Sequence, residues 1–216
     1  MFKLIKDMFS EKSSTQVVEI DKSSVLDMEE IKNHFKTVTK DAGFVENTHL
    51  IESIKKKLHP NRKNIFILDD ICEIVEILKD DFEKYLSNIG RVDEFNVVSL
   101  CGKSVGFDML SILANHSEVT VDAIMTDIIF GGNEKINGKK IIIDGVDIVI
   151  ILKSVNDNLN YIMFTGNVFS ENIENSYSFS KKFEQHIGES ILDHVLIKDA
   201  QIVFDDSVFE RIIKEL

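Results

Sequence analysis

Short apolar runs alternate with amphipathic segments through residues 63–216, and this alternation restricts the possible folds more than any other feature. The runs are three to five residues long, as expected for strands buried on both faces of a sheet, and they lie at 65–68, 96–100, 123–126, 161–164 and 195–197. Apolar residues at three- to four-residue spacing predict helices at 71–85, 107–115, 146–153, 171–186 and 207–216. Segment 146–153 also fits a strand on propensity, but the alternation favours a helix. The pattern predicts a doubly wound α/β domain with five parallel strands and right-handed crossovers.

The first 62 residues follow a different pattern, and the only proline, Pro60, lies close to the change. Helical spacing of apolar residues predicts helices over 28–42 and 47–58. We therefore expect a helical N-terminal extension or interaction segment over 1–62 and an α/β domain over 63–216. The extension is expected to pack on the domain or on a second copy of the chain. The alternative is that its amphipathic start docks on a partner or a membrane.

Charge is distributed unevenly between these two parts. The net charge is −12; residues 1–62 carry 11 basic and 10 acidic side chains, and residues 63–216 carry 14 and 27. A domain with a net charge of −13 repels a polyanion, so direct nucleic-acid binding is not expected. No apolar stretch approaches the roughly 20 residues of a membrane span, and no signal peptide is evident, which predicts a cytoplasmic protein. Cys72 and Cys101 lack metal-binding or redox spacing, which predicts two reduced thiols.

Polar residues follow four of the five expected strands. Asp69 and Asp70 follow the first, Asp127 ends the third, Thr165 the fourth and Lys198 the fifth. In open α/β sheets the functional groups lie beyond the carboxyl ends of the strands. Three carboxylates that converge there repel one another, and Mg²⁺ relieves that repulsion. A hydroxyl and an ammonium suit the oxygens of a transferring phosphoryl group.

This ordered set resembles the receiver domain of two-component response regulators, the CheY-like family. The resemblance covers residues 63–216 and is carried by segments 63–70, 121–127, 143–145, 161–166 and 195–198. It implies a flavodoxin-like fold with strand order 2-1-3-4-5. It also implies that Asp127 is the phosphoacceptor, that Thr165 donates its hydroxyl to the phosphoryl group, and that Lys198 pairs with that group. The implied Mg²⁺ ligands are Asp69, Asp70, Asp127 and the backbone carbonyl of Ile129.

The resemblance implies a signalling role in a phosphorelay rather than an enzyme. A sensor histidine kinase or a histidine phosphotransfer protein would supply the phosphoryl group. Self-phosphorylation from small donors and self-dephosphorylation are compatible with such a domain. The output would pass through contact with an unknown downstream protein or through a homodimer, since the sequence ends directly after the last expected helix and we expect no C-terminal output domain.

Several positions depart from the family pattern. Asp199 follows Lys198 where a proline is usual, and Val195 stands where an aromatic residue often acts as a switch. The segment 128–143 is long and carries Gly131-Gly132 in place of a proline, and the segment between Thr165 and Lys198 is also long. These departures keep open the alternative of a pseudo-receiver, a phosphorylation-independent protein-binding module.

Two enzymatic readings of the same residues fit less well. A haloacid-dehalogenase-type phosphatase needs Asp-x-Asp, whereas Ile71 follows Asp69-Asp70. The triplet 102–104, Gly-Lys-Ser, is similar to the end of a P-loop, but Val97 stands where the loop needs a glycine. We expect a polar turn after the second strand at that position.

Overall fold

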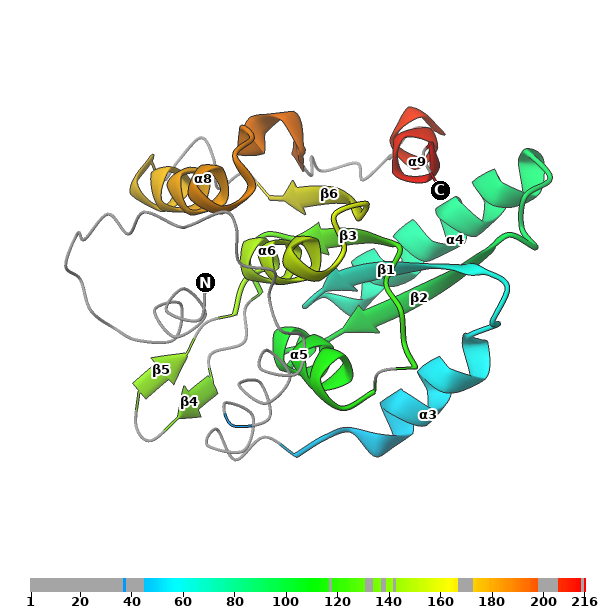
Figure 1. Cartoon of the computed structure of the whole chain (residues 1–216), viewed down its shortest axis with the longest axis horizontal. Helices are drawn as coiled ribbons and strands as arrows, with labels where there is room; N and C mark the ends of the chain where they lie inside the picture. The colour runs from blue at the N-terminus through cyan, green and yellow to red at the C-terminus, as the bar shows by residue number, and fades with distance from the viewer. Residues whose placement is uncertain are drawn as a thin grey trace.

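The computed structural model describes residues 37, 45–116, 118–130, 134–136, 139–141, 143–166, 173–197, 206–214 and 216. In this part of the chain a five-stranded parallel sheet lies between two layers of helices (Figure 1). Its strands are β1 (Lys63–Asp69), β2 (Phe95–Cys101), β3 (Ala123–Asp127), β6 (Asn160–Thr165) and β7 (Val195–Ile197). The order across the sheet is β2-β1-β3-β6-β7, which is 2-1-3-4-5 when these strands are counted along the chain. The predicted doubly wound, flavodoxin-like fold is confirmed.

The helices divide between the two faces of the sheet. One buried cluster contains side chains of α3, α5, α6 and α8, and a second cluster contains side chains of α4 and α9. The helices are α3 (Thr48–Lys57), α4 (Cys72–Asn88), α5 (Val105–Asn115), α6 (Gly145–Val155), α8 (Ile173–Ile187) and α9 (Asp206–Ile213). The five helices predicted after residue 63 are confirmed, including the ambiguous segment 146–153. None of the described helices is long and apolar enough to cross a membrane.

Strand β1 shows why its apolar run is continuous. Successive side chains of a strand point to opposite faces of the sheet. Ile65 and Ile67 therefore pack in the cluster of α4 and α9, while Phe66 and Leu68 pack in the other cluster. All four side chains are fully buried, so a polar residue at any of these positions would face a helix layer rather than solvent.

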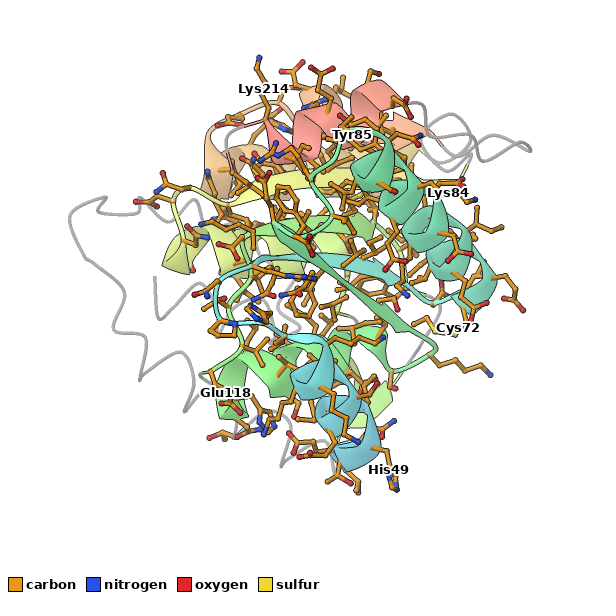
Figure 2. All side chains as sticks on the ribbon, turned by 90° about the vertical axis from the view of Figure 1, so that its right-hand side faces the viewer. His49, Cys72, Lys84, Tyr85, Glu118 and Lys214 are labelled. Atoms are coloured by element: carbon orange, nitrogen blue, oxygen red, sulfur yellow. A yellow bond between two sulfur atoms is a disulfide. The ribbon has the colours of Figure 1, made fainter. Side chains whose placement is uncertain are left out.

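The closing helix α9 covers the sheet beside α4. The ring of Phe209 stacks on Phe82 at a centroid distance of 4.7 Å and lies 5.7 Å from the ring of Tyr85. Figure 2 shows Tyr85 at the end of α4 that adjoins α9. These ring contacts join the last described helix to the first helix of the α/β domain.

Helix α3, from the N-terminal segment, packs on the α/β domain. Ile51 and Ile54 are buried in the same cluster as the side chains of α5 and α6. The Glu46 carboxylate, just before α3, accepts a hydrogen bond from Ser111 Oγ of α5 at 2.6 Å. Residues 48–57 therefore belong to the packed body, whereas the predicted boundary at residue 62 stays a prediction. The helix predicted over 28–42 lies outside the described residues except for residue 37.

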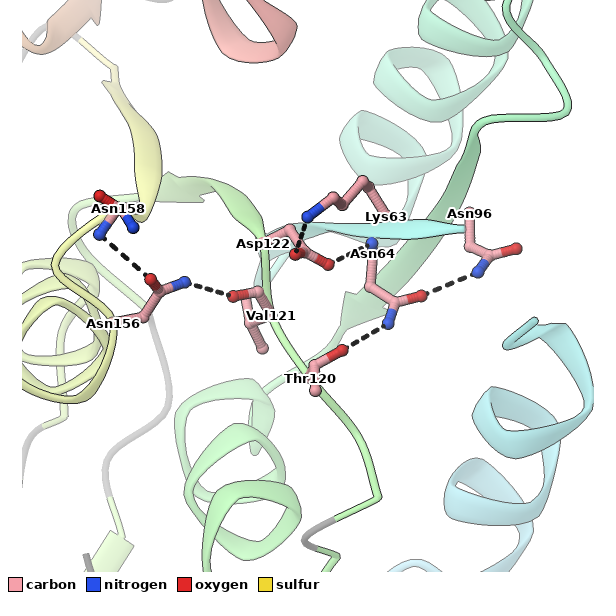
Figure 3. Close-up of polar contacts among 8 residues, drawn as sticks. All are labelled: Lys63, Asn64, Asn96, Thr120, Val121, Asp122, Asn156 and Asn158. Atoms are coloured by element: carbon pink, nitrogen blue, oxygen red, sulfur yellow. Dashed lines mark hydrogen bonds and ion pairs between the residues drawn. The ribbon is translucent and has the colours of Figure 1, made fainter. Parts of the chain in front are cut away.

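A polar network joins β1, β2 and the approach to β3 at the amino ends of the strands (Figure 3). Asp122 accepts hydrogen bonds from the Asn64 backbone N–H at 2.8 Å and from Lys63 Nζ at 3.2 Å. Asn64 Nδ2 donates to Thr120 Oγ1 at 3.0 Å, and the side-chain amides of Asn64 and Asn96 are in contact at 2.8 Å. At this end of the sheet, hydrogen bonds between neutral side chains and the Lys63–Asp122 ion pair therefore hold the strands together. Asp69, Asp70 and Asp127 lie at the other end of the sheet.

A short antiparallel hairpin lies within the long segment 128–143, where the apolar runs predict no strand. It consists of β4 (Glu134–Ile136) and β5 (Lys139–Ile141). The sequence carried a signal for it, because Asn137-Gly138 separates Glu-Lys-Ile from Lys-Lys-Ile, and Asn-Gly is a favoured two-residue hairpin connection. The hairpin follows Asp127 in the chain and precedes α6.

Candidate functional site

Three carboxylates meet where β1 and β3 end. Asp69 is the last residue of β1, Asp70 follows it, and Asp127 is the last residue of β3. One carboxylate oxygen from each of the three lies within 4.8 Å of the others. The cause is topological, because β1 and β3 are hydrogen-bonded parallel neighbours and their carboxyl ends reach the same edge of the sheet. The structure thus brings together the three acids that the sequence analysis singled out.

The backbone around the acids fixes two of the carboxylates. Asp69 Oδ1 accepts a hydrogen bond from the backbone N–H of Ile71 at 2.9 Å, and Asp127 Oδ1 accepts one from the N–H of Ile128 at 2.9 Å. Asp69 is fully buried and Asp127 is 7% exposed, while Asp70 is partly exposed. Backbone N–H groups therefore help to hold Asp69 and Asp127 in place, and Asp70 is the most exposed of the three residues.

The donor set suits a hard divalent cation. Carboxylate oxygens are the ligands that Mg²⁺ takes from proteins, usually one or two of them together with water and phosphate oxygens. Without a cation, three carboxylates this close would repel one another strongly, because two of them are buried and the third is partly buried. Ile129, whose carbonyl is the remaining predicted ligand, lies two residues after Asp127, and its side chain packs partly buried against the core. Its role as a ligand stays a prediction.

Thr165 lies at the same edge of the sheet. It is the last residue of β6, the strand next to β3, and Asp127 is in register with Phe164, one residue before it. Thr165 is almost completely buried. Lys198 lies outside the described residues, so its pairing with a phosphoryl group stays a prediction. Val195 pairs with Met163 in the sheet and packs against the core, partly buried.

The chain directly after Asp127 is tied to β6 and to α6. The Ile128 N–H donates to Phe164 O at 2.9 Å, and the Gly145 N–H donates to Ile128 O at 2.9 Å. Thr126 Oγ1 donates to the carbonyl oxygen of Asp127 at 3.0 Å. The start of α6 therefore rests against the backbone of the strand that carries Asp127.

The comparisons with known proteins give a distant likeness. No protein-family model matches the chain, and no curated protein matches it. The chain is similar to a receiver domain. The crystal structure in question is that of a response regulator receiver domain protein from Clostridium thermocellum, with a TM-score of 0.41 and 15% sequence identity over 71% of this chain and 93% of that chain. A likeness this weak carries no argument about function. The function has to be inferred from Asp69, Asp70, Asp127 and Thr165 at the carboxyl edge of the sheet.

A buried ion cluster joins α6 to α8, and the sequence analysis did not find it. Asp144 caps α6: its Oδ1 accepts from the Asp147 N–H at 2.8 Å, and Asp147 Oδ2 accepts from the Asp144 N–H at 3.2 Å. Lys182 Nζ, from α8, donates to both carboxylates at 2.7 Å. Burial and the neighbouring Asp147 raise the pKa of Asp144 to about 7. Burial lowers the pKa of Lys182, but the two carboxylates more than offset this and raise it.

The two cysteines form a disulfide, so the prediction of two reduced thiols is wrong for this structure. Cys72 and Cys101 are 29 residues apart in the sequence, and their Cα atoms are 5.0 Å apart. Local spacing does not reveal this pairing, because it depends on the order of the strands in the sheet. β1 and β2 are adjacent and parallel, so the start of α4, directly after β1, reaches the end of β2. The turn predicted over 102–104 is confirmed.

Proposed function

We propose that this chain is a response regulator receiver in a phosphorelay, with Asp127 as the phosphoacceptor. One observation carries the proposal: carboxylate oxygens of Asp69, Asp70 and Asp127 lie within 4.8 Å of one another where β1 and β3 of a 2-1-3-4-5 sheet end. Thr165 at the end of the neighbouring strand supports it. The family resemblance of the sequence supplies the roles of these residues.

Each residue has a role in the proposed transfer. A carboxylate oxygen of Asp127 attacks the phosphorus atom of a phosphohistidine; an O–P bond forms as the N–P bond breaks, and the imidazole leaves. Thr165 donates its hydroxyl to a phosphoryl oxygen, and Lys198 supplies positive charge to another. Gly166, next to Thr165, carries no side chain that would crowd the phosphoryl group, and a Cβ atom there would meet nothing within 4 Å.

Mg²⁺ is the proposed cofactor. Its ligands would be the carboxylates of Asp69, Asp70 and Asp127 and the backbone carbonyl of Ile129. Bound there, the cation would neutralise the charge that collects on the acids and the phosphoryl oxygens. The fixed rotamers of Asp69 and Asp127 keep two ligands in place before any cation arrives.

The proposed partners follow from this chemistry. A sensor histidine kinase or a histidine phosphotransfer protein would be the donor, and a downstream protein or a second copy of the chain would receive the signal. The domain would be a cytoplasmic phosphoacceptor rather than an enzyme, with slow self-phosphorylation and self-dephosphorylation as its own chemistry. The acidic surface makes nucleic acid an unfavourable direct partner.

Intact-mass measurement after incubation with Mg²⁺ and acetyl phosphate tests the proposal. We expect one phosphoryl adduct on the wild type and on Asp157→Asn, a control at an exposed carboxylate far along the chain from the cluster. We expect no adduct on Asp127→Asn, and none on the wild type when a chelator removes Mg²⁺. No adduct on folded wild type, even with a phosphohistidine donor, would sink the proposal and favour the pseudo-receiver.

A further inference from the structure

The disulfide lies at the same edge of the sheet as the acid cluster. Cys72 is the first residue of α4, two residues after Asp70. Cys101 is the last residue of β2 and stands opposite Asp69 in the parallel register. The bond therefore links the segment that carries two of the three clustered carboxylates to the neighbouring strand. Figure 2 shows Cys72 at the end of α4, with the bond between the sulfur atoms.

The disulfide reinforces a short connection that hydrogen bonds also hold, because the carbonyl oxygen of Ile71 accepts from the N–H groups of Ile74 and Val75 at 3.2 and 3.4 Å. Only Asp70 and Ile71 separate β1 from α4. Ile71, at the N-cap of α4, offers no side-chain hydrogen bond to the first turn of the helix, and its side chain is exposed. A helix start without a capping side chain frays more readily. The covalent bond at Cys72 thus anchors this end of α4, together with the hydrogen bond from the Ile71 N–H to Asp69.

The position of the disulfide suits control of the acid cluster better than stabilisation of the whole domain. Small domains use disulfides where the apolar core is insufficient. Here two extensive apolar clusters cover both faces of the sheet, and the disulfide lies at the rim, where both cysteines are partly exposed. Both cysteines thus lie near solvent, and one residue, Ile71, separates Cys72 from Asp70.

We propose that the Cys72–Cys101 disulfide is a redox switch on the acid cluster: the oxidised form holds Asp69 and Asp70 ready for a divalent cation, and reduction loosens them. The metal-binding half of this inference depends only on the clustered acids. The effect on phosphorylation rests on the proposed receiver function. The described geometry, with the acids together, belongs to the form in which the bond is present.

The reaction is a two-electron thiol–disulfide exchange with a protein or small-molecule dithiol. One thiolate of the dithiol attacks a sulfur of the Cys72–Cys101 bond, forms a mixed disulfide and releases the other cysteine as a thiolate, which takes up a proton. The second thiol of the reductant then attacks the mixed disulfide and releases the remaining cysteine. The dithiol ends as a disulfide, and Cys72 and Cys101 end as two thiols. The reverse reaction with a disulfide reagent restores the bond.

The experiment compares the full chain oxidised with oxidised glutathione, the same chain reduced with dithiothreitol, and the double variant Cys72→Ser/Cys101→Ser. Alkylation followed by intact mass counts the thiols, and calorimetry measures Mg²⁺ affinity. We expect no alkylated thiols in the oxidised form and two in the reduced form. We expect the oxidised form to bind Mg²⁺ at least about threefold more tightly, because preorganised ligands bind better. The double variant should match the reduced form and should not respond to dithiothreitol.

Phosphorylation by acetyl phosphate separates this inference from the proposed function. A faster adduct on the oxidised form supports both. A redox-dependent Mg²⁺ affinity without an adduct in either form supports the switch and overturns the receiver function. Equal Mg²⁺ affinities of the oxidised and reduced forms overturn the switch, whether or not an adduct forms. Two alkylated thiols after treatment with oxidised glutathione overturn it as well.

Discussion

Gly145 lies so close to Asp127 that no other residue fits at its position. A Cβ atom added to Gly145 would stand 1.9 Å from the carbonyl oxygen of Asp127 and 2.8 Å from Thr126 Oγ1. The atom in the way belongs to the backbone, so it cannot rotate aside as a side chain would. The first residue of α6 is therefore packed against the strand end that carries Asp127, the proposed phosphoacceptor.

Gly145→Ala should displace the end of β3 and so disturb both folding and phosphorylation. We expect a loss of about 1–3 kcal/mol in the free energy of unfolding, the range for overpacking in a dense interior, and a strongly slowed phosphoryl adduct. Urea denaturation and intact mass measure the two effects. Gly166→Ala is the matched control for stability, because its Cβ would meet nothing within 4 Å; its free energy of unfolding should stay within about 0.5 kcal/mol of the wild type. Wild-type rate and stability in Gly145→Ala would show that the contact is not rigid.

Thr165→Val should keep the shape of the side chain and remove its hydroxyl. If this group donates to a phosphoryl oxygen, its loss slows adduct formation by roughly tenfold or more, since single donors to developing charge have large effects. Thr165→Ser should retain most of the rate because it keeps the hydroxyl. Initial rates of adduct formation with acetyl phosphate measure whether the hydroxyl takes part in the transfer. The Mg²⁺ affinity should be unchanged in both variants. Equal rates for the valine and serine variants would remove Thr165 from the proposed site.

The strand order and the acid rim could be predicted because both depend on local sequence and on one topological rule. The run over 65–68 is continuous because alternate residues face two separate helix layers, and Ile67 and Leu68 pack in different clusters. Asp69 and Asp127 end neighbouring parallel strands, so their convergence follows once the strand order is known. Neither the strand order nor the convergence of the acids depends on a side-chain contact between elements.

The remaining features depend on which side chains meet across elements, which periodicity does not encode. Lys182 looks like any solvated lysine on an amphipathic helix, and only the packing of α8 on α6 brings it to Asp144 and Asp147. Cys72 and Cys101 have no motif spacing, and they meet because β2 lies beside β1. The β4–β5 hairpin is different, because the Asn-Gly turn signal for it is present in the sequence itself.

The buried carboxyl group of Asp144 should make stability depend on pH. The pKa of Asp144 is raised to about 7 from an ordinary value of 3.8, so the folded protein binds a proton there that the unfolded chain has already released. The stability from this group is fully present below about pH 4 and is lost as pH rises to about 7. His186 on α8 acts in the opposite direction, because burial and Lys182 lower its pKa. Comparison with a variant is therefore needed to isolate Asp144.

Asp144→Asn keeps an N-capping side chain and removes the titrating group. Urea denaturation of both proteins at pH 5, 6, 7 and 8 measures the effect. We expect the wild type to lose stability relative to the variant as pH rises, so that the difference in unfolding free energy shifts steadily towards the variant. A difference that stays constant across this range would mean that Asp144 is ionised throughout and that Lys182 fully compensates it.

Helix α3 should be needed for the stability of the α/β domain, although it precedes the predicted domain boundary. Ile54 is 2% exposed in the cluster shared with α5 and α6. Ile54→Ala removes buried apolar atoms and leaves a cavity, which typically costs about 2–5 kcal/mol. Lys56→Ala, an exposed position on the same helix, is the control and should change the free energy of unfolding by no more than about 0.5 kcal/mol. If Ile54→Ala has the same free energy of unfolding as the wild type, residues 63–216 form their core without α3, and the N-terminal segment is free for another role. A large loss in the free energy of unfolding means instead that a fragment starting at residue 63 lacks part of its own core.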